Sequence, residues 1–131
     1  MEAFKVEGGK KLSGTIKPQG AKNEALQVIS AVLLTEEKVI IDNIPNIIDV
    51  NRLIDLLKCM GVSIEKINEH KYSFEASSIN LDYLNTKDFE EKAKGLRGSI
   101  MIIGPLLSRF GHASIPKPGG DKIGRRKLDT H

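Results

Sequence analysis

The stretch DVNRLIDLLKCMG, residues 49–61, predicts an amphipathic helix that is closed by a glycine. Its apolar residues recur at i, i+3, i+4 and i+7, which places on one face of a helix Val50, Leu53, Ile54 and Leu57. Gly61 is the typical stop signal, so the helix is expected over residues 49–60. Residues 62–67 and 72–74 then read as two strands joined by a polar turn, which predicts a β-hairpin.

Two further helices are predicted outside this stretch. One covers residues 21–34 and has at helical spacing Ala25, Leu26, Ile29, Val32 and Leu33. The other covers residues 93–110, ends at Gly111 and has on one face Leu96, Ile100, Ile103, Leu107 and Phe110. Short strands are expected at residues 4–6, 12–16, 39–42 and 112–115. The polar residues 82–92 fit neither pattern.

This order of strands, helices and a hairpin indicates an α/β (α+β) fold. An apolar helix, a glycine and a short strand occur twice, at Gly61 and at Gly111. Either the chain contains a repeated β/α unit, or this is the ordinary punctuation of a compact α/β protein.

The composition is that of a soluble, single-domain globular protein. The chain has 131 residues, of which 40% are hydrophobic and 28% charged. Its one cysteine, Cys59, excludes an internal disulfide and fits a reducing compartment. The first residues have no signal-peptide pattern, and the longest apolar run is too short to span a bilayer. We therefore expect a cytoplasmic protein with no membrane partner.

The positive charge is concentrated at the end of the chain. The formal net charge is +3, and all of the excess lies from Lys117 onward, where five basic residues accompany Asp121 and Asp129. A local excess of this kind points to a local anion, although a solvated basic tail has the same composition.

Three segments could carry chemistry. Lys22 and Asn23 follow Gly20-Ala21 at the start of the first helix, where free N–H groups attract anions. Alternatively, Asn23 only caps this helix and Lys22 lies along its surface. Arg97, between Gly95 and Gly98, opens the last helix and is either a second anion ligand or a surface arginine.

The third segment is Gly119-Gly120-Asp121. A carboxylate on a glycine-rich loop can act as an acid when the loop closes, but aspartate is also common in ordinary turns. His70, His112, His131 and Cys59 have no metal-binding spacing. Aromatic residues make up 5% of the chain and do not alternate with its basic residues, which argues against nucleic acid as a partner.

Together, in this order, the segments resemble those of the UDP-N-acetylglucosamine 1-carboxyvinyltransferase family of enolpyruvyl transferases. The similarity runs from Phe4 to the last residue and rests on three motifs: Gly20-Ala21-Lys22-Asn23; Leu96-Arg97-Gly98-Ser99 before an apolar helix; and Pro118-Gly119-Gly120-Asp121-Lys122-Ile123-Gly124 followed by Arg126 and Leu128-Asp129-Thr130-His131. The related enzyme of the shikimate pathway shares the fold, but its usual N-terminal lysine and serine motifs do not appear here.

The resemblance implies two similar domains of repeated β/α units, with helices inside and sheets outside. The present chain would be an N-terminal fragment with about one and two-thirds repeats. Residues 1–20 would form initial strands that pack with the second domain, and residues 21–131 would be part of the catalytic domain. A surface meant for another domain could drive self-association.

The resemblance also implies the reaction. The family transfers the enolpyruvyl group of phosphoenolpyruvate to the 3′-hydroxyl of UDP-N-acetylglucosamine by addition and elimination, without a metal or organic cofactor. This is the first committed step of peptidoglycan synthesis, on which cell-wall biogenesis, cell shape and cell division depend. Lys22 and Asn23 would contact phosphoenolpyruvate, Arg97 and Arg126 would hold the anionic substrates, and Asp121 would be the proton donor. The nucleotide sugar would lie against Arg97, Arg126, Lys127, Leu128, Asp129 and Thr130.

One departure from the family pattern concerns Asp121, because most members have cysteine there. An aspartate can donate a proton but is not alkylated by fosfomycin as a thiolate is, so we expect an enzyme insensitive to this drug. The nearby Lys122, Arg125 and Arg126 favour the ionised carboxylate, which bound phosphoenolpyruvate would have to offset. A non-catalytic module that binds a nucleotide sugar or phosphate is the alternative function, and the fragment alone is expected to be inactive.

Overall fold

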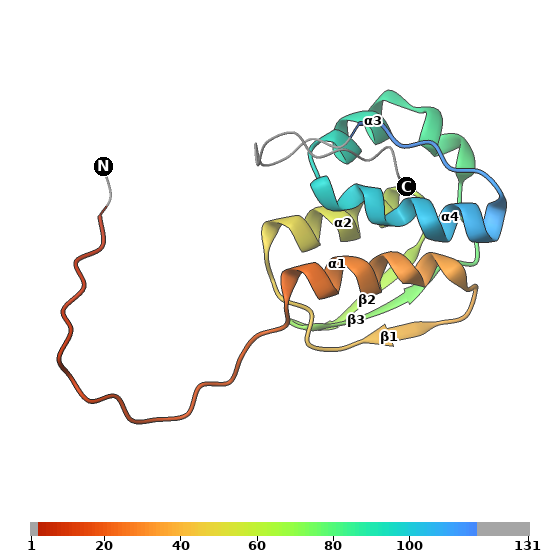
Figure 1. Cartoon of the computed structure of the whole chain (residues 1–131). Helices are drawn as coiled ribbons and strands as arrows, with labels where there is room; N and C mark the ends of the chain where they lie inside the picture. Colours follow the sequence, from red (N-terminus) through yellow and green to blue (C-terminus); the bar gives the residue numbers. More distant parts are fainter. Residues whose placement is uncertain (1–2, 118–131) are drawn as a thin grey trace.

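The computed structural model describes residues 3–117. From residue 22 onward these residues form a group of helices packed on one side of a small antiparallel sheet (Figure 1). The elements, in chain order, are α1 (Lys22–Ala31), the 3₁₀ helix η1 (Val32–Leu34), β1 (Val39–Ile41), α2 (Ile48–Cys59), β2 (Ser63–Asn68), β3 (Lys71–Glu75), the 3₁₀ helix η2 (Leu81–Asn85), α3 (Lys87–Lys94), the 3₁₀ helix η3 (Arg97–Ile102) and α4 (Ile103–Phe110).

The sheet has the order β1-β3-β2, and both neighbouring pairs are antiparallel. Val39 lies opposite Phe74 in one pair, and Ile64 lies opposite Phe74 in the other. Phe74 is fully buried, because it points from the central strand toward the helices. The predicted hairpin and the α/β (α+β) fold class are therefore confirmed.

The helix predicted from residues 49–60 is α2, and it supplies the centre of the core. The four residues at helical spacing are all buried, as are Leu56 and Met60. Gly61 follows with a φ of 100°, the left-handed conformation that ends the helix at low cost for glycine. The five apolar residues predicted for the first helix are likewise all buried along α1 and η1.

The single helix predicted over residues 93–110 is wrong. The chain there forms the end of α3, then η3, then α4. A 3₁₀ helix has three residues per turn instead of 3.6, so it changes which side chains face inward. Ile102 and Leu106 are fully buried instead of Ile103 and Leu107, and Leu107 is 49% exposed.

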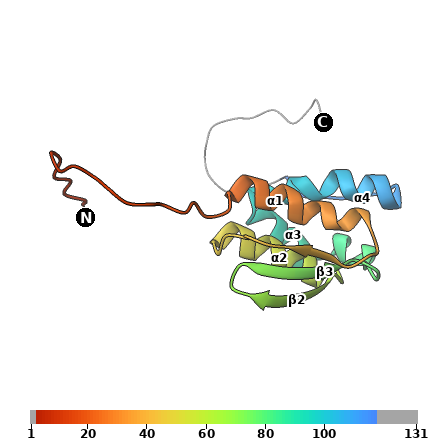
Figure 2. The same ribbon diagram turned by 90° about the horizontal axis from the view of Figure 1, so that it is seen from below.

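Three predicted strands are also absent. Residues 4–6 and 12–16 have no regular structure, and residues 3–19 extend away from the packed helices and sheet (Figures 1 and 2). Phe4, Val6, Leu12 and Ile16 are almost fully exposed, because no strand within the described residues pairs with this segment. Residues 112–115 have no strand partner among residues 3–117 either.

Arg109, near the end of α4, joins distant parts of this fold. Its guanidinium donates hydrogen bonds to the carbonyl oxygens of Leu33, Thr35 and Ala76 at 2.8–3.1 Å, and it forms an ion pair of 3.0 Å with Glu36. The Arg109 side chain is only 13% exposed. It satisfies three carbonyl groups at the ends of η1 and β3 and thereby connects the helices to the sheet.

Candidate functional site

The N-terminus of α1 has the properties of an anion site. Ala21 is the residue before the first turn and makes no side-chain capping bond, so the first N–H groups of this ten-residue helix have no cap from it. Lys22 and Asn23 are the first two helical residues, and both are exposed. The alternative that Asn23 caps this helix is therefore wrong, because Asn23 lies inside the helix. The positive end of the helix and the Lys22 ammonium act at the same place.

A close backbone contact fixes where this helix begins. A side chain on Gly20 would put its Cβ 2.0 Å from the carbonyl oxygen of Asn43, so only glycine fits without movement. Asn43 itself has a φ of 58°, in the left-handed region that asparagine tolerates. The next residue, Ile44, donates its N–H to the carbonyl of His70 at 2.8 Å, and the His70 ring nitrogen Nδ1 lies 3.0 Å from the Ile44 carbonyl. The turn against which Gly20 rests is thus held by the hairpin.

Arg97 is the first residue of η3 and is partly buried. The helix η3 packs against α1, and a Cβ on Gly98 would lie 3.0 Å from a methyl carbon of Leu26. Leu26 is one helical turn after Lys22, on the same face of α1. The predicted anion-binding residues Lys22 and Arg97 therefore lie on two elements that pack against each other. The contact between Leu26 and Gly98 is within one helical turn of each residue.

The turn that carries Arg97 is well satisfied by hydrogen bonds. The buried Ser99 hydroxyl donates to the carbonyl of Ala93 at 2.9 Å, and the Leu96 N–H donates to the same carbonyl at 3.2 Å. Gly95 donates its N–H to Glu91 at 3.1 Å. These hydrogen bonds hold the backbone from which the Arg97 side chain extends.

Two charged residues of α2 reach these elements, and sequence reasoning missed both. Asp49 forms an ion pair with the Lys22 ammonium at 2.9 Å, and Arg52 donates a hydrogen bond to the Gly95 carbonyl at 3.1 Å. Asp49 and Arg52 are three residues apart and so share one face of α2. The only signal in the sequence is that they are polar residues on the exposed face of an amphipathic helix.

The remaining predicted site residues lie outside the described residues. These are Asp121, the expected proton donor, and the expected sugar-nucleotide contacts Arg126, Lys127, Leu128, Asp129 and Thr130. Their roles stay predictions.

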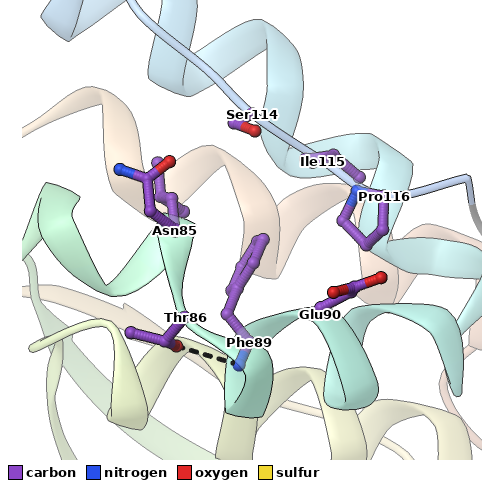
Figure 3. A pocket seen from close by; sticks show the side chains of 8 residues that line it. Asn85, Thr86, Phe89, Glu90, Ser114, Ile115 and Pro116 are labelled. Atoms are coloured by element: carbon purple, nitrogen blue, oxygen red, sulfur yellow. Dashed lines mark hydrogen bonds between the residues drawn. The ribbon is translucent and has the colours of Figure 1, made fainter.

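A cavity of about 320 Å³ lies elsewhere, between η2, α3 and residues 114–116 (Figure 3). Thr86 on its wall accepts a hydrogen bond from the N–H of Phe89 and caps α3. None of the candidate residues Lys22, Asn23 and Arg97 lines this cavity. The cavity is thus separate from the anion-binding elements.

A small cluster of polar groups lies at α3. The Tyr83 hydroxyl donates a hydrogen bond to Asp88, and Lys92 donates to the same carboxylate. Burial and the bond to Asp88 raise the pKa of Tyr83, whereas the bond from Lys92, followed by that from Tyr83, lowers the pKa of Asp88. The Asp88 bond likewise raises the pKa of Lys92. The hydrogen bonds of this cluster do not involve the candidate residues Lys22, Asn23 or Arg97.

The described residues show neither a metal-binding cluster nor a membrane-spanning helix. Residues 3–117 contain no group of three or more histidine, cysteine or carboxylate side chains placed to hold a metal ion. None of their helices combines the length and the apolar character that crossing a bilayer requires.

The sequence is similar to a known protein family and to several named enzymes. The sequence model of the EPSP synthase (3-phosphoshikimate 1-carboxyvinyltransferase) family matches residues 6–131. Proteins named UDP-N-acetylglucosamine 1-carboxyvinyltransferase are 56% identical in Porphyromonas gingivalis and 57% identical in Bacteroides fragilis, over all 131 residues. The protein of that name from Bradyrhizobium diazoefficiens is 44% identical over 126 residues. The chain spans 28–30% of the length of these relatives.

Comparison with solved structures agrees at the level of the fold. The enolpyruvyl transferase NikO from Streptomyces tendae is similar with a TM-score of 0.56 and 22% identity. The similarity covers 79% of this chain and 23% of that protein. The resemblance to enolpyruvyl transferases expected from the three motifs is confirmed, and the chain belongs to the EPSP synthase (3-phosphoshikimate 1-carboxyvinyltransferase) family.

Proposed function

We propose that the protein carrying this chain transfers the enolpyruvyl group of phosphoenolpyruvate to the 3′-hydroxyl of UDP-N-acetylglucosamine and releases phosphate. One structural observation carries the proposal: Lys22 and Asn23, at an N-terminus of α1 with no side-chain cap, lie on the element against which the Arg97 helix packs. The identity of 56–57% to relatives of that name supports this acceptor.

The proposed roles follow from the charge of the reactants. Phosphoenolpyruvate carries a phosphate and a carboxylate, and Lys22, Asn23 and the N-terminus of α1 offer the donors and positive charge that such groups need. Arg97, with Arg126 and residues 127–130, holds the anionic nucleotide sugar. Asp121 is the proposed general acid on the glycine-rich loop.

The chemistry balances in two steps. The sugar hydroxyl oxygen forms a bond to C2 of phosphoenolpyruvate and gives its proton to water, while Asp121 gives a proton to the methylene carbon C3. In the second step C3 returns a proton to the Asp121 carboxylate, the double bond forms again, the C2–O bond to phosphate breaks, and the released phosphate takes up a proton from water. Because addition and elimination need only positioned charge and proton transfer, residues of these types are sufficient for the roles given to them.

The same proposal places the protein in the first committed step of peptidoglycan synthesis, in the cytoplasm. A second domain of the same polypeptide would complete the site, so we expect the 131-residue chain alone to show no turnover.

Phosphate release by the full-length protein tests the proposal. With phosphoenolpyruvate and UDP-N-acetylglucosamine we expect stoichiometric phosphate and a sugar nucleotide heavier by the enolpyruvyl group, measured by mass spectrometry. Shikimate 3-phosphate replaces the sugar nucleotide as the control acceptor. Turnover with shikimate 3-phosphate instead would reassign the acceptor, whereas binding of UDP-N-acetylglucosamine without phosphate release would favour the non-catalytic module.

A further inference from the structure

Two side chains of α2 contact α1 and the turn that leads into η3, the segments that carry the proposed anion ligands. Asp49, in the first turn of α2, contacts Lys22 across 27 residues of sequence. Arg52, one turn later, contacts Gly95 across 43 residues. One face of α2 therefore contacts both segments that carry proposed anion ligands, which points to a common role in holding them in place.

The contact between Asp49 and Lys22 is better explained by orientation than by stability. The ion pair measures 2.9 Å, and the two side chains are 45% and 37% exposed. Exposed pairs of this kind add little to the free energy of unfolding, since water screens them and two long side chains lose freedom. A lysine has four rotatable bonds, so a fixed carboxylate on α2 selects the conformers that keep its ammonium at the α1 N-terminus.

The contact between Arg52 and Gly95 fixes a backbone. Gly95 follows the last residue of α3, and its N–H already donates to Glu91 at 3.1 Å. Arg52 donates a hydrogen bond to the Gly95 carbonyl at 3.1 Å. Leu96, the next residue, is buried, and Arg97 follows it. The path of the chain into Arg97 is therefore held from the α2 side as well as from α3.

We infer that Asp49 and Arg52 are positioning residues of the anion site. Asp49 orients the Lys22 ammonium toward phosphoenolpyruvate, and Arg52 fixes the turn from which Arg97 reaches the second anionic substrate. The inference rests on the proposed function for the identity of the substrates, but it concerns residues to which the family resemblance gave no role.

Steady-state kinetics of the full-length protein separate positioning from a structural role. Asp49→Asn is expected to raise the KM for phosphoenolpyruvate by roughly tenfold, the order of a lost charge-assisted hydrogen bond, and to change kcat less. Asp55→Asn, which removes an exposed carboxylate from the same helix, is the matched control and is expected to match the wild type. Arg52→Gln is expected to raise the KM for UDP-N-acetylglucosamine, and Arg52→Lys to restore part of the loss.

A double-mutant cycle supplies the decisive readout. If Asp49 acts through Lys22, Asp49→Asn has no further effect on the KM in a Lys22→Gln background. Additive effects in that background, a KM unchanged by Asp49→Asn, or a lowered KM through relief of carboxylate repulsion would each overturn the role of Asp49. The same comparison of Arg52→Gln in an Arg97→Gln background decides the role of Arg52.

The outcome can be told apart from failure of the proposed function. If the full-length wild type releases no phosphate, the function is wrong, but calorimetric titration with phosphoenolpyruvate and with inorganic phosphate still compares Asp49→Asn with Asp55→Asn. Weaker binding by Asp49→Asn alone supports the positioning role. Equal binding by both variants, with unchanged circular dichroism, contradicts it.

Discussion

Gly20 shows how a single residue sets the position of the binding helix. It rests against a turn held by the hairpin, and a Cβ at this position would overlap the Asn43 carbonyl oxygen. Lys22 and Asn23 follow within three residues. Relief of the overlap has to move either the turn or the start of α1, where the proposed anion ligands Lys22 and Asn23 lie.

Gly20→Ala is therefore expected to lower the free energy of unfolding by about 1–3 kcal/mol, the usual cost of overpacking, and to weaken phosphoenolpyruvate binding. Urea unfolding and calorimetric titration measure the two effects. Gly104→Ala is the matched control, because nothing lies within 4 Å of a Cβ there and the position is helical. A Gly20→Ala protein as stable as the Gly104→Ala protein would contradict this account.

Asp121 is expected to make the full-length protein unreactive toward fosfomycin. The full-length protein is expected to keep its activity during incubation with fosfomycin, because a carboxylate is not alkylated as a thiolate is. Asp121→Cys should become subject to time-dependent covalent inactivation, detected as a mass increase of the intact protein. Asp121→Asn should lose most of its turnover. Undiminished turnover by Asp121→Asn would remove this residue from the proton-transfer role.

Sequence reasoning found the residues whose local context is informative. Lys22 and Arg97 stand beside glycines at predicted helix starts, and the structure places both at such starts. It did not find Asp49 and Arg52, because their importance depends on partners 27 and 43 residues away. Such pairs become visible only when the packing of α2 against the other helices is known.

Among the elements, α2 and the hairpin could be predicted because their apolar periodicity is unbroken and glycine marks the helix end. The segment 93–110 could not, since Gly95 and Gly98 break the helix and η3 changes the periodicity in its middle. Strands 4–6 and 12–16 were wrong for another reason. Their residues have the right type, but a strand also needs a neighbour, which the sequence pattern does not reveal.

The helix α3 offers a test of electrostatics at the level of an element. Hydrogen bonds from Lys92 and Tyr83 lower the pKa of Asp88 below its ordinary value of 3.8. A carboxyl group with a lowered pKa in the folded state stabilises the fold above pH 3.8, and this contribution is lost as the pH falls through the lowered pKa.

Asp88→Asn is thus expected to be less stable than the wild type at neutral pH, with a difference that shrinks below about pH 4. Urea unfolding between pH 7 and pH 2.5 measures this difference. Glu91→Gln, on the same helix, is the control for simple loss of a surface charge. A difference that stays constant down to pH 2.5 would show that the Asp88 charge is not its source.

At the scale of the whole molecule, the packed helices expose several large apolar side chains. Large apolar side chains are 42–52% exposed on four elements that pack against one another, namely Val28 on α1, Leu34 on η1, Met101 on η3 and Leu107 on α4. Large exposed apolar side chains on neighbouring elements often mark a surface for association.

We expect the 131-residue chain to self-associate through this helical surface at micromolar concentration. Leu107→Glu should shift it toward the monomer in sedimentation-velocity experiments without loss of helical circular dichroism. Ile67→Glu is the matched control, because Ile67 is 47% exposed but lies on β2, in the sheet. Equal shifts for both variants would assign the association to general hydrophobicity instead.

The Arg109 contacts have a consequence for biosynthesis. The carbonyl groups of Leu33, Thr35 and Ala76 receive their donor from a residue 33–76 positions later in the chain. During translation these hydrogen bonds can form only after Arg109 has left the ribosome. The closure of such long loops also costs entropy. Nascent chains that end before α4 therefore lack this donor for the three carbonyl groups, and the helices and the sheet are not yet joined by it.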